Sequence, residues 1–488
     1  MTDTATNPHH RHRWLILGLL GLAQLMVILD STIVNIALPS AQRALKFSSD
    51  DRQWVVSAYA LAFGSLLLVG GRVSDLFGRK WTFVGGLLGF GIASAVGGAA
   101  PSFDVLVAAR ALQGAFAALL APAALSLLST TFTDDGERNR AFGVFGAVAG
   151  AGASVGLLLG GVLTEYLNWR WCLFVNLAIA GIVVAGALPL LTNLRPNNRP
   201  AIDVPGTLTA TVGLFSLVYA FSQAQSHGWA STLVLSFIVA GVILLAAFVA
   251  VERRSAHPLL PLKVVLDRNR GGSYLALGLA SAAIFGVNLF LTYFIQQTLG
   301  FSPVKCGLAF LPLSVAVVVT AGVAQTQVVP RLGGKPLIVT GMGLGAIALV
   351  MLAQLSLDSS YGSDVLPWLA LLGVGFGLII APALALATLG VDPDDTGVAS
   401  AMVNTGQQLG GSIGVALLAT FVSTAVSNYV ASHGRSPQVA AAAAVHGYTI
   451  AFWWGAAIFA VGTATTAIVL RRGVPDNAEL QAAAAPAA

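Results

Sequence analysis

Two residues of opposite charge, Asp30 and Arg110, stand inside stretches of the sequence that are otherwise apolar. Asp30 lies at the middle of MVILDSTIVNIALP, and Arg110 lies near the start of ARALQGAFAALLAP. Apolar surroundings favour the neutral form of a carboxyl group, whereas a nearby guanidinium favours the ionised form. If Arg110 can approach Asp30 and leave it, the carboxyl group can release and bind a proton. The chemistry that this pair offers is therefore reversible proton binding.

The depths of the two charges within their stretches predict that they meet. If the fourth apolar stretch begins near Asp104, Arg110 lies six residues, or roughly 9 Å, along the helix. Asp30 lies nine residues, or roughly 14 Å, before Pro39, where the first stretch ends on the same side. A charge within a membrane helix normally faces a partner or a cavity. We expect the pair to act in proton coupling; a fixed structural ion pair is the alternative.

The elements that must position this pair are membrane-spanning helices. The 488 residues are 56% hydrophobic and only 9% charged, and their mean hydropathy is +0.82, which is too apolar for a soluble domain. Fourteen apolar runs begin at Trp14 and continue almost to the C-terminus, each of about twenty residues and long enough to cross a ~30 Å hydrocarbon layer as a helix. The sequence predicts an all-α, polytopic membrane protein.

The positive charges predict the orientation of these spans. If the N-terminus is cytoplasmic, 18 of the 25 lysines and arginines fall on the cytoplasmic side, six fall outside, and Arg110 lies within a span. Such an excess is typical of cytoplasmic loops. We therefore expect a multi-pass protein of the cell membrane with both termini in the cytoplasm, and the basic composition needs no nucleic-acid partner.

An internal repeat indicates how the spans are grouped. LLAPAALSLL begins at Leu119 and IIAPALALAT begins at Ile379, so the copies lie in the fourth and twelfth spans. A weaker pair is SDLFGRK (74–80) and VPRLGGK (329–335). Because the separation is even, both copies have the same orientation, as in transporters built from parallel repeats. Two adjoining bundles of six would separate the copies by only six spans. Two inserted helices are therefore expected, at about 206–223 and 231–251.

This grouping divides the chain into five parts in a 6+2+6 arrangement. The predicted parts are a cytoplasmic tail (1–13), a six-helix bundle (14–195), two inserted helices with cytoplasmic connectors (196–270), a second six-helix bundle (271–471) and a cytoplasmic tail (472–488).

The segment GRVSDLFGRK joins the second and third spans on the cytoplasmic side. Gly71 permits a close backbone approach and Gly78 permits a tight turn. Asp75 can lie at a helix terminus, and Arg79 and Lys80 follow as a basic pair. An ordinary basic loop is the alternative, but the spacing favours a conformational role.

The fifth span contains GASVGLLLGG, with glycines at Gly152, Gly156, Gly160 and Gly161. Glycines four residues apart line one face of a helix and let a second helix approach closely. The same letters include G-x-S-x-G, the pattern of a hydrolase nucleophile, but that motif requires a turn from a strand into a helix. We therefore interpret the stretch as a packing surface.

These motifs together resemble those of one known family. GRVSDLFGRK resembles the signature loop of the major facilitator superfamily, and GASVGLLLGG resembles the antiporter motif of its proton-coupled exporters, with Leu157 in place of proline. LDSTIVNIALP resembles the first-span motif of its drug:proton antiporters. WRWCLFVN (169–176), FIQQTLGFSPVKCGLAFLPLS (294–314) and VNTGQQLGGSIG (403–414) are similar to landmarks of the fourteen-span, EmrB/QacA-like group, with Gln407 where a basic residue is common.

The resemblance, which extends from about Trp14 to Arg472, implies two bundles that rock about a central site. Polar and aromatic residues of the spans are the candidates to line that cavity: Asn35, Gln113, Phe116, Asn288, Phe290, Tyr293, Asn404 and Gln407. Such a mostly apolar cavity suits amphipathic ligands. For each aromatic residue, ordinary packing or lipid contact is the alternative.

The leading hypothesis is a proton-coupled exporter of small hydrophobic or amphipathic compounds, of the kind that confers antibiotic resistance. The alternatives are a dedicated exporter of one natural product or lipid-like metabolite, a facilitator without proton coupling, and a membrane-embedded enzyme. The seven histidines are not spaced as metal ligands, so we expect neither an enzyme nor a metal site.

The proton gradient is expected to take the place of a cofactor. The expected partners are a small-molecule substrate, protons and the lipid bilayer, with no nucleic acid and no obligate protein partner. Cys172 and Cys306 are expected to be free thiols, with a disulfide as the alternative.

Overall fold

The computed structural model describes residues 12–47, 52–192, 203–255, 258–392, 395–434 and 436–473, and its regular elements are helices. The first six are α1 (Arg13–Leu45), α2 (Arg52–Phe77), α3 (Arg79–Gly98), α4 (Phe103–Thr131), α5 (Asp135–Tyr166) and α6 (Trp171–Leu190). The next two are α7 (Val204–His227) and α8 (Thr232–Glu252).

The remaining helices begin with the short α9 (Leu262–Leu266) and include three π-helical turns. They are α10 (Arg268–Tyr293) with η2 (Phe294–Thr298), α11 (Pro303–Ala309), α12 (Leu311–Val323) with η3 (Ala324–Val328), α13 (Val329–Leu332), α14 (Gly334–Leu352), η4 (Tyr361–Val365) with α15 (Leu366–Ala387), α16 (Thr396–His433) and α17 (Pro437–Val469).

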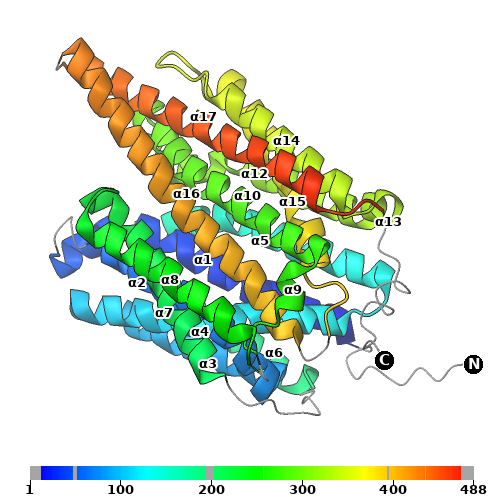
Figure 1. The fold of residues 1–488 in the computed structure, drawn as a ribbon. Helices are drawn as coiled ribbons and strands as arrows, with labels where there is room; N and C mark the ends of the chain where they lie inside the picture. Colours follow the sequence, from blue (N-terminus) through cyan, green and yellow to red (C-terminus); the bar gives the residue numbers. More distant parts are fainter. Residues whose placement is uncertain are drawn as a thin grey trace, which may run out of the picture.

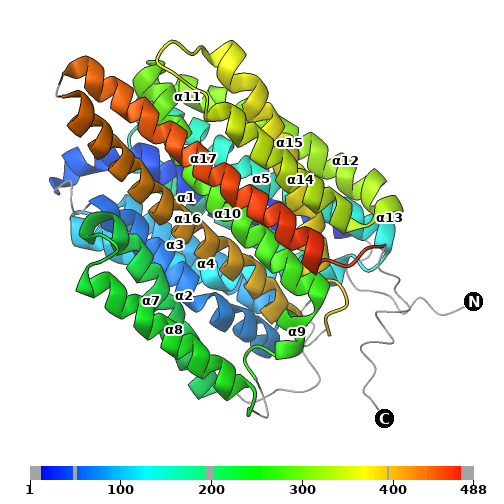
Figure 2. The ribbon, with the colours of Figure 1, turned by 45° about the horizontal axis from the view of Figure 1, so that its top comes forward.

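The helices form two bundles that meet along two seams (Figure 1). Helices α1 to α6 pack against one another, and α10, α12 and α14 to α17 make the second bundle. At one seam α2 lies against α16, and at the other α5 lies against α11, α12 and α15. Helices α7 and α8 lie side by side on the flank of the first seam, where α7 contacts both α2 and α16 (Figure 2).

The number and position of the spans agree with the sequence. Within the described residues, thirteen helices are long and apolar enough to cross a membrane, and a fourteenth is counted if the bent α5 is one span. Its segments Gly136–Gly150 and Val155–Tyr166 meet at 45°, so this helix bends although Leu157 replaces the proline of the resembled motif. The inserted pair, α7 and α8, occupies the two predicted ranges to within a few residues.

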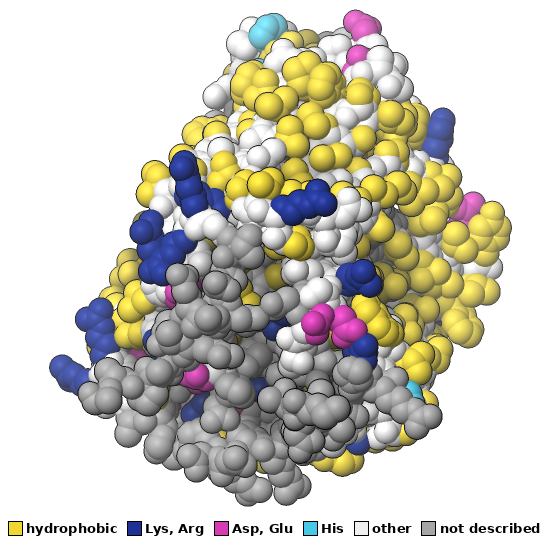
Figure 3. All heavy atoms as spheres, turned by 90° about the vertical axis from the view of Figure 1, so that its right-hand side faces the viewer, with side chains coloured by type: hydrophobic (Ala, Val, Ile, Leu, Met, Phe, Trp, Pro, Cys, Tyr) yellow, Lys and Arg dark blue, Asp and Glu magenta, His cyan; other side chains and the backbone are white. Residues whose placement is uncertain are grey.

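One end of the molecule carries α9, the beginning of α1 and the end of α17, and we call it the α9 end; the other is the opposite end. Figure 3 looks onto the α9 end, where lysine and arginine side chains surround the face while the flanks are largely hydrophobic. This distribution is the one that a bilayer favours, because apolar side chains face lipid and charged ones reach water.

The weaker sequence repeat, SDLFGRK and VPRLGGK, forms the same glycine turn and lysine hydrogen bond in each bundle. Gly78 joins α2 to α3 with φ of 94°, and Gly333 joins α13 to α14 with φ of 76°, a region of backbone space that favours glycine. Two residues later, Lys80 donates to the carbonyl of Leu188 near the end of α6, and Lys335 donates to the carbonyl of Leu470 just after α17, each over 2.7 Å. In each bundle a lysine therefore ties the third helix to the sixth.

Candidate functional site

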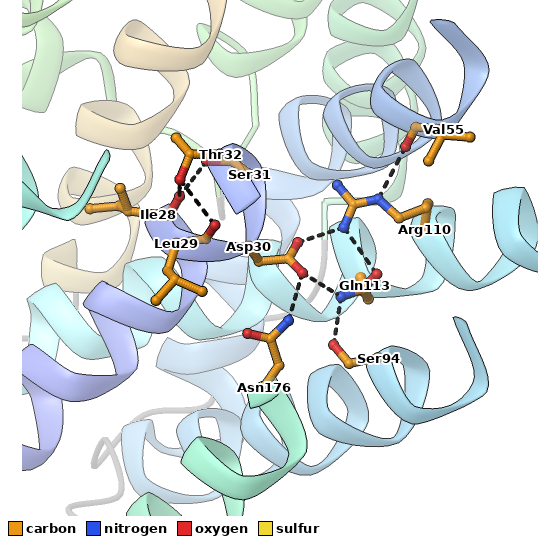
Figure 4. A network of polar contacts seen from close by, with 10 residues as sticks. All are labelled: Ile28, Leu29, Asp30, Ser31, Thr32, Val55, Ser94, Arg110, Gln113 and Asn176. Carbon is orange, nitrogen blue, oxygen red and sulfur yellow. Dashed lines mark hydrogen bonds and ion pairs between the residues drawn. The ribbon is translucent and has the colours of Figure 1, made fainter. Parts of the chain in front are cut away.

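The two charges that the sequence singled out lie in direct contact (Figure 4). Arg110 Nη1 lies 2.5 Å from Asp30 Oδ2. The other carboxylate oxygen, Oδ1, accepts hydrogen bonds from Gln113 Nε2 over 2.9 Å and from Asn176 Nδ2 over 2.7 Å. All four side chains are buried. The proximity predicted from helix depth is confirmed, and the carboxyl group of Asp30 receives hydrogen bonds from three donors.

Further contacts hold the guanidinium of Arg110. Its Nε donates to the carbonyl of Val55 and its Nη1 donates to Gln113 Oε1, both over 3.0 Å. The guanidinium carbon also lies 4.5 Å from the centroid of the Tyr59 ring, within the range of a cation–π interaction. A buried ion pair needs such additional hydrogen bonds, because Coulomb attraction alone seldom offsets the desolvation of two charges.

The whole network lies within the first bundle. Asp30 comes from α1, Val55 from α2, Ser94 from α3 and Asn176 from α6, while α4 supplies Arg110 and Gln113 (Figure 4). The ring of Tyr59 also comes from α2. Ser94 Oγ accepts from Gln113 Nε2 over 2.5 Å. Because the described contacts of the carboxylate come from the first bundle alone, its charge acts on the packing of α1 against α4 and α6.

An apolar cluster separates this network from the opposite end. It includes Ile33 of α1, Leu106 of α4 and Leu173 of α6, together with Phe47 and Trp169 next to the connecting turns. Each of the three helical residues lies closer to the opposite end than the polar residue of the same helix. A proton that reaches Asp30 from that end must therefore pass a layer of packed hydrocarbon.

Three residues of the network, Asn176, Ser94 and Tyr59, were not predicted from the sequence. Asn176 is the last residue of WRWCLFVN, which was noted only as a landmark. The feature that could have identified Asn176 is its amide group in an otherwise apolar span, because an amide is costly to bury without a hydrogen-bond partner. Ser94 and Tyr59 gave no comparable signal, because hydroxyl groups are common in membrane helices.

The glycines of α5 pack against the segment of α1 that carries Asp30. A Cβ atom at Gly152 would lie 2.8 Å from Ile28, one at Gly156 would lie 1.9 Å from Thr32 Oγ1, and one at Gly160 would lie 2.8 Å from Ile33.

The other side of α5 faces the second bundle. A Cβ atom at Gly161 would lie 3.2 Å from Val304 of α11, and one at Gly307 of α11 would lie 3.6 Å from the carbonyl carbon of Leu157. Helix α5 thus contacts both the Asp30 helix and the second bundle.

The segment GRVSDLFGRK forms the end of α2, the Gly78 link and the start of α3, and its α2 part lies at the seam between α2 and α16. Asp75 Oδ1 accepts a hydrogen bond from the backbone N–H of Gly397 over 3.1 Å, at the N-terminus of α16, where a carboxylate is favourable. A Cβ atom at Gly71 would lie 2.7 Å from the carbonyl oxygen of Gly397. Arg79 begins α3, and Lys80 makes the tie to α6 described above. The segment GRVSDLFGRK therefore joins the two bundles at the α9 end.

Two further polar contacts join the bundles at the α9 end. Arg138 Nη2 donates to Thr388 Oγ1 over 3.1 Å, and Gln325 Nε2 donates to Asn139 Oδ1 over 2.9 Å. Between the bundles, a void of about 10 Å³ lies where α1, α4 and α5 face α15 and α16.

The candidate cavity residues lie in several places. Asn404 and Gln407 line the central void with Gln24 of α1. Gln113 belongs to the Asp30 network, and Phe116 packs against α3, where a Cβ atom at Gly89 would lie 2.2 Å from its ring.

The other candidates lie on α10 and α1. Phe290 and Tyr293 are in ring contact with Tyr448 of α17. Asn288 also lies on α10, and its buried Oδ1 has no hydrogen-bond partner among the described residues. The side chain of Asn35 lies outside what the structure describes. Cys172 and Cys306 are both buried free thiols.

Comparison with known proteins gives consistent similarities. Residues 20–415 match the model of the Major Facilitator Superfamily. The chain is 49% identical to a puromycin resistance protein of Streptomyces alboniger, over 94% of this chain and 90% of that one. It is 39% identical to a cephamycin export protein of Amycolatopsis lactamdurans, over 83% and 84%. Its fold is similar to that of the proton:xylose symporter XylE, with a TM-score of 0.68 at 15% identity, over 97% of this chain and 99% of that one.

We predict that Gly156→Ala lowers the unfolding temperature of the detergent-solubilised protein. The new methyl group would meet Thr32 Oγ1 at 1.9 Å and the backbone of Leu29 at 3.2 Å, and overpacking of this kind typically costs about 1–3 kcal/mol. Thr32→Ala in the same chain removes the closest atom and should restore part of the loss. Gly85→Ala is the matched control, because a Cβ atom there meets nothing within 4 Å. If Gly156→Ala and Gly85→Ala unfold at the same temperature, α1 and α5 do not make this contact.

Proposed function

The chain belongs to the major facilitator superfamily, and from this premise we propose that it exports small hydrophobic or amphipathic molecules in exchange for protons. Within the superfamily we place it in the fourteen-span, EmrB/QacA-like drug:proton antiporter group. The inserted pair α7 and α8 and the buried aspartate of α1 support this placement. Membership of a transporter family also favours transport over an enzymatic activity.

The observation that carries the proposal is the fully buried contact between Asp30 and Arg110. Their side chains are 0% and 1% exposed. Ionisable residues buried in a membrane protein are energetically costly, and they usually mark a functional site. Removing one charge from a buried pair leaves the other uncompensated. Protonation of Asp30 therefore destabilises the packing of α1 against α4, because it removes the attraction between the Asp30 carboxylate and Arg110. Arg110 can then form a hydrogen bond or ion pair with another group.

The packing of α5 offers a route from this event to the substrate. When the attraction between α1 and α4 weakens, α1 can shift relative to α4, and α5 must follow because its glycines lie against α1. The other side of α5 faces the second bundle, so the shift reaches the space between the bundles. Proton binding from outside and proton release inside would then be linked to outward movement of the substrate.

The orientation follows from the charge distribution. We infer that the α9 end is cytoplasmic, because the connecting loops with most lysines and arginines lie there. We therefore propose that both termini are cytoplasmic and that the protein belongs to the cytoplasmic membrane. The apolar cluster around Ile33 and Trp169 then lies between Asp30 and the outside.

A dedicated exporter of one natural product is the second candidate. The relatives reported above are named for resistance to, or export of, a single antibiotic each. If this chain acts in the same way, its substrate is one natural product, and the proton mechanism is unchanged.

We predict that Asp30→Asn abolishes uphill export. Inside-out membrane vesicles with an acidic lumen and a fluorescent amphipathic dye measure this directly, since export appears as accumulation in the lumen. Asparagine has a similar shape but cannot carry the proton, so accumulation should fall to the level of vesicles without the protein. Asp104→Asn is the matched control, because Asp104 is an exposed carboxylate at the start of α4. Unchanged accumulation with Asp30→Asn would remove Asp30 from the coupling mechanism.

A substrate panel separates broad export from dedicated export. Cells that express the protein are exposed to chemically diverse antibiotics and dyes, and the minimal inhibitory concentration of each is measured. Broad export predicts raised values for several unrelated amphipathic compounds, whereas dedicated export predicts a rise for one structural class. In either case the rise should disappear when a protonophore collapses the gradient. A rise that persists would indicate transport without proton coupling.

A further inference from the structure

The amide of Asn176 differs from the amide of Gln113 in how firmly it is held. Gln113 uses both ends, because its Oε1 accepts from Arg110 and its Nε2 donates to Asp30 and to Ser94. Asn176 uses one end, because its Nδ2 donates to Asp30 while its buried Oδ1 has no hydrogen-bond partner in the described part of the chain. The side chain of Asn176 is 0% exposed.

Protonation of Asp30 changes what the carboxyl group needs from its neighbours. An ionised carboxylate only accepts hydrogen bonds, whereas a protonated one also donates through its hydroxyl group. In the structure all three neighbours present N–H groups to Asp30. One of them must therefore offer an acceptor when the proton arrives, or the new hydroxyl group is buried without a partner.

Only one of the three neighbours can do so at small cost. A guanidinium has no acceptor, and turning Gln113 would point its amide N–H groups at those of Arg110. A half-turn of Asn176 about its Cβ–Cγ bond exchanges Nδ2 and Oδ1. After this turn Nδ2 is the amide atom without a partner, whereas before the turn it was Oδ1.

We propose that Asn176 is a positioning residue that follows the proton on Asp30. Its amide donates to the ionised carboxylate, and after protonation it turns so that Oδ1 accepts from the carboxyl hydroxyl group. Both charge states of Asp30 are thereby supplied with a partner, which keeps the proton affinity of the site within a usable range. This inference rests on the proposed role of Asp30 as the proton carrier. Among the described residues, the titratable groups that face Asp30 are Arg110 from α4, Tyr59 from α2 and Cys172 from α6.

The first test compares Asn176→Leu with Gln113→Leu in the pH profile of export. Loss of a donor that serves only the ionised form makes proton binding easier and moves the midpoint to higher pH by about one to two units. We expect this for Gln113→Leu. Asn176→Leu removes a partner from both forms, so its midpoint should move by less than half as much, although Asn176 makes the shorter hydrogen bond. An equal or larger shift for Asn176→Leu would overturn the proposal.

The second test uses infrared difference spectra of the protein in lipid vesicles, recorded between high and low pH. In the wild-type protein a carboxyl band that is absent from Asp30→Asn should appear together with a downward shift of a side-chain amide carbonyl band. That amide shift should be missing in Asn176→Leu. A carboxyl band without the amide shift overturns the role of Asn176 alone. The absence of any band that depends on Asp30 overturns the proton-carrier role itself.

If Asn176→Leu does not fold, Asn176→Thr provides a second test of the role of Asn176. A hydroxyl group can both donate and accept, so uphill export in Asn176→Thr should stay near the wild-type level with little shift of the pH midpoint. Loss of uphill export in a folded Asn176→Thr protein would contradict the proposal.

Discussion

A carboxylate buried in a membrane protein must be either compensated or neutral, and this constraint organises the first bundle. Asp30 meets it in the described conformation with one cation and two amides, which come from α4 and α6. Those helices are held in register by the same contacts. The charge state of one side chain therefore sets the packing of several helices, and a change in that state cannot remain local.

The proposed proton site and the space between the bundles are separate. Asp30 is enclosed within the first bundle, whereas the central void is lined by Gln24, Asn404 and Gln407 from both bundles. In the proposed exchange mechanism, the proton and the substrate are therefore coupled mechanically and do not compete directly for one group. Helix α5 is placed for this task, because it contacts α1 through its glycines and the second bundle along α11, α12 and α15.

The sequence predicted the helices and the ion pair well because both depend on one-dimensional quantities. Apolar length defines the spans, the separation of the repeats revealed α7 and α8, and depth along two helices brought Asp30 to Arg110. The rest of the network depends on which side of each helix faces inward. A mean hydropathy does not carry that information, so Asn176 and Ser94 were not assigned roles. For the same reason the candidate cavity residues, chosen by type, lie in several places, with Phe116 of α4 packed against α3 and Phe290 of α10 beside α17.

The two lysine ties also bear on how a chain of this kind can grow. Lys80 fastens α3 to the end of α6, and Lys335 fastens α14 to the end of α17. In each six-helix bundle, the third helix is therefore hydrogen-bonded to the end of the sixth helix of the same bundle. Helices inserted between Leu190 and Arg268 interrupt neither of these two lysine hydrogen bonds. The position of α7 and α8 is thus a tolerant insertion point, where a twelve-helix architecture can be extended to fourteen without dismantling either half.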